Sequence, residues 1–134
     1  MIHLDTSFLV DLLRESSKAE HGPAHELLGE LHDRELRISV FAASELYAGA
    51  ELADNAEAER AKVVKLCAAV EIAYPDEHFA PAYGRTLAPL HRAGEMIASM
   101  DLLIATSAIV DRAPLVTANR RHFARIAGLD LVSY

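Results

Sequence analysis

Three carboxylates in this chain occupy positions where a folded protein normally places apolar side chains. Asp5 follows the short run of residues 1–4, Glu45 interrupts an alanine-rich stretch, and Asp101 opens the most hydrophobic segment of the sequence. Acidic side chains are rarely buried without a partner, and no lysine or arginine is adjacent to any of the three. Unpaired acids in apolar surroundings indicate a site for a divalent cation.

Helix capping is the alternative explanation for two of these acids. Asp is a favoured N-cap residue, and Asp5 and Asp101 each directly precede a segment with helical spacing. Taken alone, each of them is more often a cap than a ligand.

A cap does not explain Glu45, because this residue falls inside a helical segment. The residues three, four and seven positions away are Phe41, Ala48, Gly49 and Leu52, which would share its face of the helix. The spacing therefore predicts that Glu45 lies on the core-facing stripe, with small neighbours that leave room beside it.

Repulsion between converging acids also favours a metal site. Two carboxylates about 4 Å apart repel by about 4 kcal/mol at an effective dielectric constant of about 20. A purely structural role would not compensate for this repulsion, whereas a bound hard cation would offset it. Carboxylate and water ligands suit Mg²⁺ or Mn²⁺.

Short apolar runs alternate with helical segments along the chain, which predicts a parallel sheet covered on both faces. Such sheets form their sites beyond the carboxyl ends of the strands, so the acids can converge there. Pro81 and Pro89 should break or kink the helix that contains them. We expect a single domain over residues 1–134, with strands at 2–4, 36–40, 71–74, 115–117 and 129–132 and helices at 6–14, 24–34, 41–52, 56–70, 76–93 and 102–111.

Composition restricts the partners and the compartment. Proteins that bind nucleic acid through a broad basic surface usually show the opposite of this chain's net charge of −7. Any nucleic-acid role must therefore rest on bound metal, local basic residues or a basic partner. The longest uncharged run, residues 102–110, is far shorter than the roughly 20 residues of a membrane span. His3 and Asp5 do not suit a signal peptide, and Cys67 alone excludes an internal disulfide. We expect a cytoplasmic protein with no membrane contact.

Four segments resemble a known family. Residues 5–13 (DTSFLVDLL), 44–49 (SELYAG) and 101–106 (DLLIAT) resemble the three signatures of PIN-domain nucleases. The closer match is to the VapC-type toxins of bacterial toxin–antitoxin pairs, which residues 114–129 (PLVTANRRHFARIAGL) also resemble. The resemblance covers essentially the whole chain in the expected order.

The resemblance implies a three-layer α/β/α sandwich with a mostly parallel sheet of four to five strands. It also implies that Asp5 and Asp101 hold Mg²⁺, or Mn²⁺ as a substitute, with Glu45 beside them directly or through water. The activity would be that of a metal-dependent endoribonuclease. The partners would be RNA, a second copy in a homodimer, and a VapB-type antitoxin that inserts a peptide across the active-site groove.

Many PIN nucleases have a fourth acid near the end of the fourth strand, and this chain departs from that pattern. Asn119 and His122 stand in the region instead. Asn119 can orient a water or ligate weakly, and His122 is either a ligand or merely polar. The second metal position is therefore open.

Other polar residues near the predicted strand ends are candidates for supporting roles. Thr6 and Thr117 can orient ligands or water through their hydroxyl groups, although Thr6 is also a routine residue for a helix start. Arg120, Arg121 and Arg125 cluster after the fourth strand and can reach phosphates. The alternative for these arginines is a solvated helix face.

The mechanism expected from these residues is hydrolysis, in which a metal-activated water attacks the RNA phosphate in line and leaves a 5′-phosphate and a 3′-hydroxyl. An aspartyl phosphatase would need a second Asp where Ser7 stands, and a receiver domain would need an acidic pair before Asp5. The remaining alternative is a catalytically silent PIN-like module that only binds protein.

Overall fold

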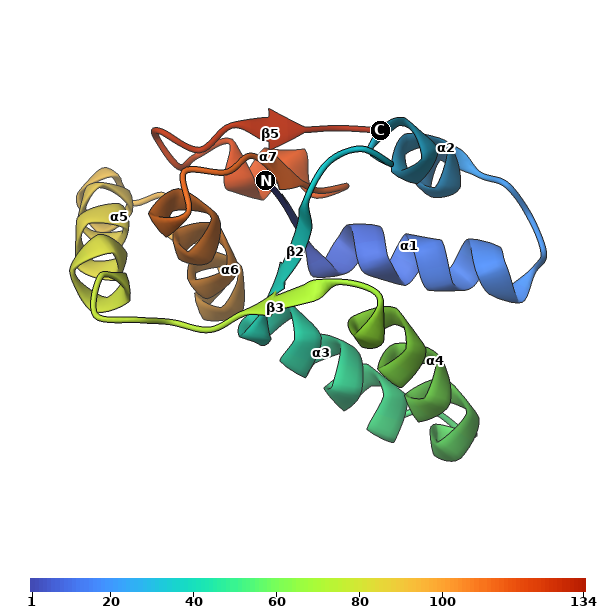
Figure 1. Ribbon diagram of the computed structural model, residues 1–134. Helices are drawn as coiled ribbons and strands as arrows, with labels where there is room; N and C mark the ends of the chain where they lie inside the picture. The colour runs from blue at the N-terminus through green and yellow to red at the C-terminus, as the bar shows by residue number, and fades with distance from the viewer.

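The computed structural model describes residues 1–134, which form a parallel five-stranded sheet with helices on both sides (Figure 1). The strand order is β3-β2-β1-β4-β5, and every neighbouring pair is parallel. Parallel pairing of short, apolar strands fits the predicted alternation of strands and helices. The strands are β1 (Ile2–Leu4), β2 (Leu36–Ser39), β3 (Glu71–Ala73), β4 (Leu115–Val116) and β5 (Leu131–Val132).

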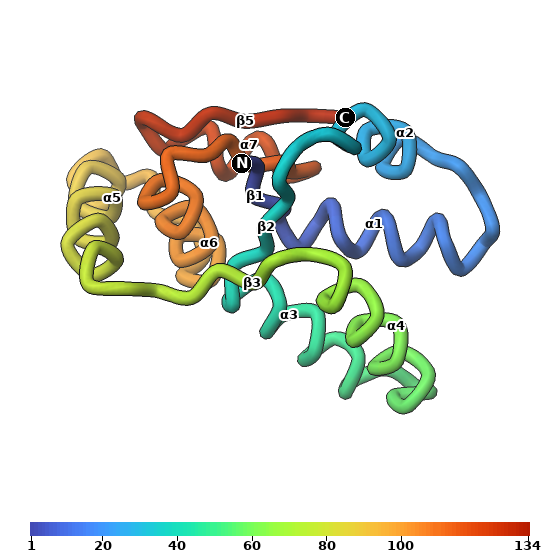
Figure 2. Tube along the Cα trace, viewed as in Figure 1, coloured from blue at the N-terminus to red at the C-terminus, as the bar shows by residue number.

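Seven helices surround the sheet, and the trace shows them in layers (Figure 2). In Figure 1, α5 and α6 lie on one side of the strands, and α1 and α2 lie on the other. This arrangement confirms the predicted three-layer α/β/α fold. The helices are α1 (Thr6–Ser17), α2 (Pro23–Glu30), α3 (Val40–Glu51), α4 (Ala56–Ala68), α5 (Phe79–Ala93), α6 (Ser99–Val110) and α7 (Arg120–Phe123).

The core lies between the strands and the helices α1, α2, α3 and α6, which all contribute buried apolar side chains. Burial of the apolar strand and helix faces provides the main stabilisation of the fold. In α6, side chains on all sides of the helix are buried, as its uniformly apolar sequence predicts. No helix has the length and apolar character that crossing a membrane would require. The largest buried apolar side chains are Phe8, Phe123, Ile2, Leu4, Leu9, Ile38, Leu102, Ile104 and Leu115.

Of the break or kink predicted at the two prolines, the break is wrong, because α5 continues through both. Pro81 is the third residue of the helix, where backbone N–H groups have no helical partner in any case. Pro89 lies inside the helix and leaves one carbonyl without its usual donor. Ala82 and Leu90 are buried on the same helix, and this packing outweighs the missing hydrogen bond.

One acidic residue fixes the junction between α1 and α2. Glu15, near the end of α1, is buried and accepts hydrogen bonds from the backbone N–H groups of Gly22, Ala24 and His25 at 3.0 Å each. These donors belong to the start of α2, which a side chain of its own does not cap. Glu15 therefore caps α2 from a distance and anchors it to α1.

Candidate active site

Asp5 directly follows β1 and points its carboxylate into a network of hydroxyl groups. It occupies the N-cap position of α1, yet its side chain makes no capping hydrogen bond, so capping does not explain it. Ser7 and Thr117 both donate to its Oδ2 atom, each at 2.7 Å. Since both hydroxyls use the same oxygen, Oδ1 is left for a further partner. Asp5 is only 3% exposed, so this orientation is tightly fixed.

The same hydroxyl groups hold the turn that follows β4. Thr117 Oγ1 accepts the backbone N–H of Asn119 at 2.9 Å, and Ser7 Oγ accepts that of Ala118 at 3.0 Å. Ser7 was not among the residues predicted for the site. Its signal in the sequence was only its position two residues after Asp5, which places it in the first turn of α1 beside the strand ends.

Glu45 lies on α3 but not on its buried face, so the predicted core-facing position is wrong. The buried residues of α3 are Ala42, Ala43, Leu46 and Ala50, while Glu45 is half-buried. Apolar residues occur on every side of α3, so their spacing could not distinguish the buried face. Glu45 instead borders the open surface beside α1, where Thr6 Oγ1 donates to its Oε1 atom at 2.7 Å.

Asp101 is the third residue of α6, and the N-cap position is Ala98, so Asp101 is not a helix cap. The helix begins earlier than predicted because Ser99 and Met100 belong to its first turn. The Asp101 side chain is 20% exposed. Burial raises its pKa, and the nearby charges of Asp5 and Glu45 raise it further. Side-chain contacts bring the three acids to one edge of the sheet. Thr6, next to Asp5 in the chain, bonds Glu45. Thr117 bonds both Asp5 and the backbone of Asn119, which contacts His122 beside Asp101.

The two candidates for a fourth position lie together next to Asp101. His122 Nδ1 is 3.8 Å from Asp101 Oδ2, and the amide nitrogen of Asn119 is 2.9 Å from the same His122 atom. The positive charge of a protonated His122 would lower the pKa of Asp101, against the effect of the two acids. Asn119 thus contacts His122, and His122 contacts Asp101.

The three arginines after β4 are all exposed, and none of them bonds to a site acid. Arg120 donates to Ser133 Oγ at 3.4 Å, and Arg125 donates to the Met96 carbonyl at 3.2 Å. They therefore neither neutralise the acids nor block access to them.

A different carboxylate shows what a balanced acid looks like in this fold. Asp111, at the end of α6, lies 2.6 Å from His3 Nε2 and accepts from Arg37 Nη1 at 3.0 Å. Neither lysine nor arginine pairs with any of the three site acids. The charge at the site is therefore left for a partner outside the chain.

The side chains at the site suit a hydrated cation. No group of three or more His, Cys, Asp or Glu side chains is arranged to hold an ion by itself. Mg²⁺ rarely needs such a group, because it keeps several waters and uses one or two carboxylates. Asp5 and Asp101 can supply direct oxygen ligands, and Glu45, held by Thr6, can act through water.

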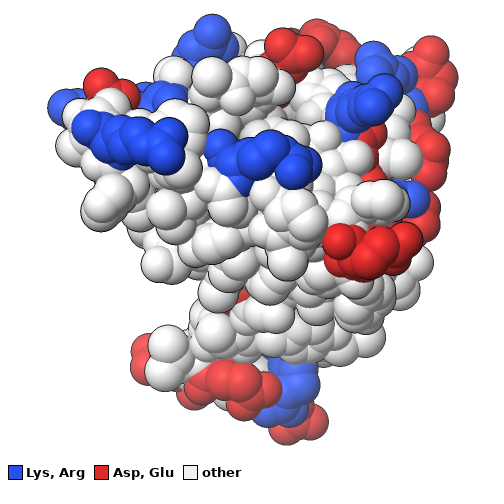
Figure 3. All heavy atoms as spheres, turned by 90° about the vertical axis from the view of Figure 1, so that its left-hand side faces the viewer, with Lys and Arg blue, Asp and Glu red and all other residues white.

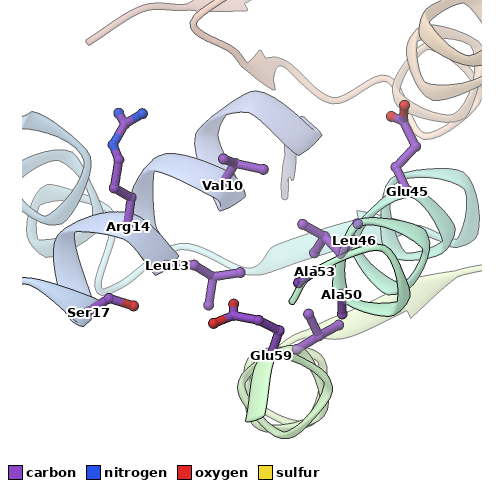
Figure 4. Close-up of a pocket in the computed structure, with 11 residues that line it drawn as sticks. Val10, Leu13, Arg14, Ser17, Glu45, Leu46, Ala50, Ala53 and Glu59 are labelled. Atoms are coloured by element: carbon purple, nitrogen blue, oxygen red, sulfur yellow. The ribbon is translucent and has the colours of Figure 1, made fainter. Parts of the chain in front are cut away.

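A cavity of about 320 Å³ adjoins Glu45 between α1, α3 and α4. Its walls include Val10 and Leu13 from α1 and Leu46 from α3. Figure 4 shows Glu45 at the edge of this cavity, apart from Glu59 on α4. An apolar groove therefore leads up to the acidic site.

Comparisons with known proteins agree with this architecture. The family model of the PIN domain matches residues 2–129. Ribonuclease VapC1 of Haemophilus influenzae is 32% identical over 127 residues, which cover 95% of this chain and 92% of that protein.

Solved structures show the same likeness in three dimensions. A chain in the crystal structure of VapBC2 from Rickettsia felis, bound to a DNA fragment from its promoter, superposes with a TM-score of 0.91 and 28% identity, over 100% of this chain and 99% of that one. A chain of the DNA-bound VapBC from Salmonella typhimurium gives a TM-score of 0.89 and 27% identity, over 99% and 98%. The chain belongs to the PIN-domain family, and within that family to the VapC proteins.

Proposed function

We propose that this protein is a Mg²⁺-dependent endoribonuclease and the toxin of a toxin–antitoxin pair. The observation that carries the proposal is the convergence of three acids, one directly after β1, one on α3 and one on α6, without a lysine or arginine to balance them. The relative from Haemophilus influenzae bears the name ribonuclease. Unpaired acids at the edge of a sheet can hold a metal ion, and a bound metal ion assists the hydrolysis of phosphodiester bonds.

The residues of the chain would divide the work between them. Ser7 and Thr117 hold Asp5 through Oδ2 and leave Oδ1 without a hydrogen bond, and Thr6 holds Glu45 at the rim of the site. When bound, Mg²⁺ would lower the pKa of a coordinated water and offset the negative charge that develops on the phosphate. His122, next to Asp101, is the group at the site that can add a positive charge.

RNA cleavage by the purified protein, freed of any antitoxin, tests the proposal. Structured RNAs should be cut with Mg²⁺ and left intact with EDTA. Asp5→Asn should lower the rate by more than about a hundredfold, because losing even a group that only orients a metal ligand costs about 10–100-fold. The matched control is Asp33→Asn, at an exposed position in the turn after α2.

Two outcomes would contradict this function. Undiminished cleavage by the Asp5→Asn protein would exclude a mechanism through the acids. If the wild-type protein cleaves no RNA and Glu45→Gln leaves antitoxin binding unchanged, the catalytically silent binding module is favoured.

The proposed partner is a VapB-type antitoxin, since the superposed chains come from VapBC complexes. The apolar groove beside Glu45 suits the apolar side of an antitoxin peptide, and basic side chains on the peptide would complement the site acids. We also propose a homodimer acting in the cytoplasm. Sedimentation of the isolated protein tests its oligomeric state, and a monomer would exclude the homodimer.

A further inference from the structure

Charge is unevenly divided along this acidic chain. Residues 1–84 contain seven basic and sixteen acidic side chains, whereas residues 85–134 contain six arginines and only four acids. The second part forms most of α5 together with α6, α7 and the connections between them. Figure 3 shows basic side chains gathered on the upper half of the face that includes α5.

The arginines of this second part are unpaired. All six are exposed, and none forms a salt bridge. In contrast, Arg37 and Arg60 in the first part are paired with acids. Since no carboxylate neutralises these guanidinium groups, this face can attract an anion despite the net charge of −7. The six are Arg85, Arg92, Arg112, Arg120, Arg121 and Arg125.

A cavity of about 420 Å³ lies within this face, and it has no role in the site described above. Arg85 lines it from α5, and Arg125 lines it from the turn that follows α7. Pro89, Ile126 and Gly128 provide apolar walls, and Glu95 is the single acid among the lining residues. The lining of the cavity thus contains two arginines without salt bridges and one carboxylate.

Two short segments of the chain lead from the lining of this cavity to the acidic site. Arg125 follows His122 by three residues, and His122 lies 3.8 Å from Asp101. Arg125 also donates to the carbonyl of Met96, in the connection that leads into α6 and to Asp101. Residues 122–125 and 95–101 therefore join the lining of the cavity to the acidic site.

We propose that this cavity binds phosphate groups of the RNA strand at a point outside the scissile bond. The inference rests on the proposed function and assigns the substrate backbone to Arg85 and Arg125. Guanidinium groups match phosphate oxygens with paired, charge-assisted hydrogen bonds. Contacts to phosphate supply affinity and position the strand without reading its sequence. Glu95 opposes this binding by like-charge repulsion.

The test measures RNA affinity apart from cleavage. A fluorescent single-stranded RNA is titrated with Asp5→Asn protein, and fluorescence anisotropy is followed over a series of salt concentrations. Adding Arg85→Gln and Arg125→Gln together should weaken binding about tenfold, and should reduce the salt slope by about 1.4, since each phosphate contact to a single strand contributes about 0.7.

Two further variants have matched roles in the same titration. Arg34→Gln removes an exposed arginine without a salt bridge in the first part of the chain and should leave affinity unchanged. Glu95→Gln removes the opposing charge and should strengthen binding. Melting temperatures equal to that of the parent would show that the variants are folded.

The outcomes separate this inference from the proposed function. Unchanged affinity and salt slope in the double variant would overturn the phosphate site, even if the wild-type protein cleaves RNA. In a parallel titration with inorganic phosphate, a double variant that loses affinity for phosphate but not for RNA would also overturn it. Conversely, weakened RNA binding in the double variant would support the site even if the wild-type protein cleaved no RNA.

Discussion

Two partly buried acids, Glu15 and Asp101, have pKa values that are shifted in opposite directions. Burial raises the pKa of Glu15, but hydrogen bonds from His25, Ala24 and Gly22 outweigh it and lower the pKa to about 2. Burial also raises the pKa of Asp101, and there the neighbours Asp5 and Glu45 add to the increase. The environment of Glu15 stabilises its charge, whereas that of Asp101 opposes it.

The difference separates an acid that stabilises the fold from one that costs stability. Glu15 receives the N–H groups at the start of α2, which favour a negative charge. Asp101 also lies in the first turn of a helix, yet two other acids surround it and no arginine balances them. A protein retains such an arrangement where a ligand outside the chain completes it.

Removing the charge of Asp101 should have the largest effect on RNA cleavage. Asp101→Asn should lower RNA cleavage by more than about a hundredfold, since it removes a proposed metal ligand. The free energy of unfolding should stay equal or increase, because the substitution relieves repulsion from Asp5 and Glu45. Cleavage assays and urea unfolding of the same preparation check both parts. A variant with intact cleavage would place Asp101 outside the reaction.

Crowding Glu15 should affect stability without affecting the site. A Cβ atom at Gly22 would lie 2.5 Å from Glu15 Cδ and 2.6 Å from Oε2, so Gly22→Ala should displace the carboxylate. We expect the free energy of unfolding to fall, because the displaced carboxylate loses its hydrogen bonds to the N–H groups of Ala24 and His25. Urea unfolding measures this loss, and RNA cleavage by the folded variant should match that of the wild type.

The matched control is Gly29→Ala, within α2 itself. A Cβ atom there meets nothing within 4 Å. Alanine is the better helix former, so this variant should gain about 0.5–1 kcal/mol. Equal losses at the two glycines would show that Gly22 is not constrained by Glu15.

Local patterns predicted the order of elements and the identity of the acids. Apolar runs identified β1 and β4, and helical spacing identified α1 and α6, because both signals lie within a few residues. The position of Asp5 at a strand end followed directly from this order. The fold could therefore be predicted before any contact was known, whereas the roles of Asp5 and Asp101 came mainly from the resemblance to PIN-domain nucleases and stay predictions.

Contacts between distant segments could not be predicted in the same way. Ser7 gains its role only because the turn after β4 lies against α1, and Glu15 gains its role only because α2 folds back onto it. The buried face of α3 depends on which neighbours pack against it. Pro89 is tolerated in α5 because tertiary packing compensates for a local cost.

Divalent metal should stabilise the protein through the acids and not through Glu15. At a Mg²⁺ concentration about ten times the dissociation constant, the free energy of unfolding should rise by about 1.4 kcal/mol. Thermal melts with Mg²⁺, and with NaCl at the same ionic strength, measure the specific part. The rise should vanish in Asp101→Asn and persist in Glu15→Gln. An equal rise in both variants would indicate binding elsewhere.

Acid titration should give the smallest effect, since it follows single groups among many. Glu15 has a pKa of about 2 in the folded protein, against an ordinary value of 4.5. A lowered pKa stabilises the fold above the ordinary value, and that stabilisation is lost as the pH falls from 4.5 towards about 2. The difference in unfolding free energy between wild type and Glu15→Gln should shrink over this range.

For Asp101 the sign reverses, because its pKa is raised. Its charge destabilises the fold above its ordinary pKa of 3.8, so protonation on acidification relieves that cost. Asp101→Asn should therefore be more stable than wild type near neutral pH, and this difference in unfolding free energy should shrink as the pH falls. Urea unfolding at a series of pH values measures both gaps, and gaps that change with the same sign would contradict the contrast between the two acids.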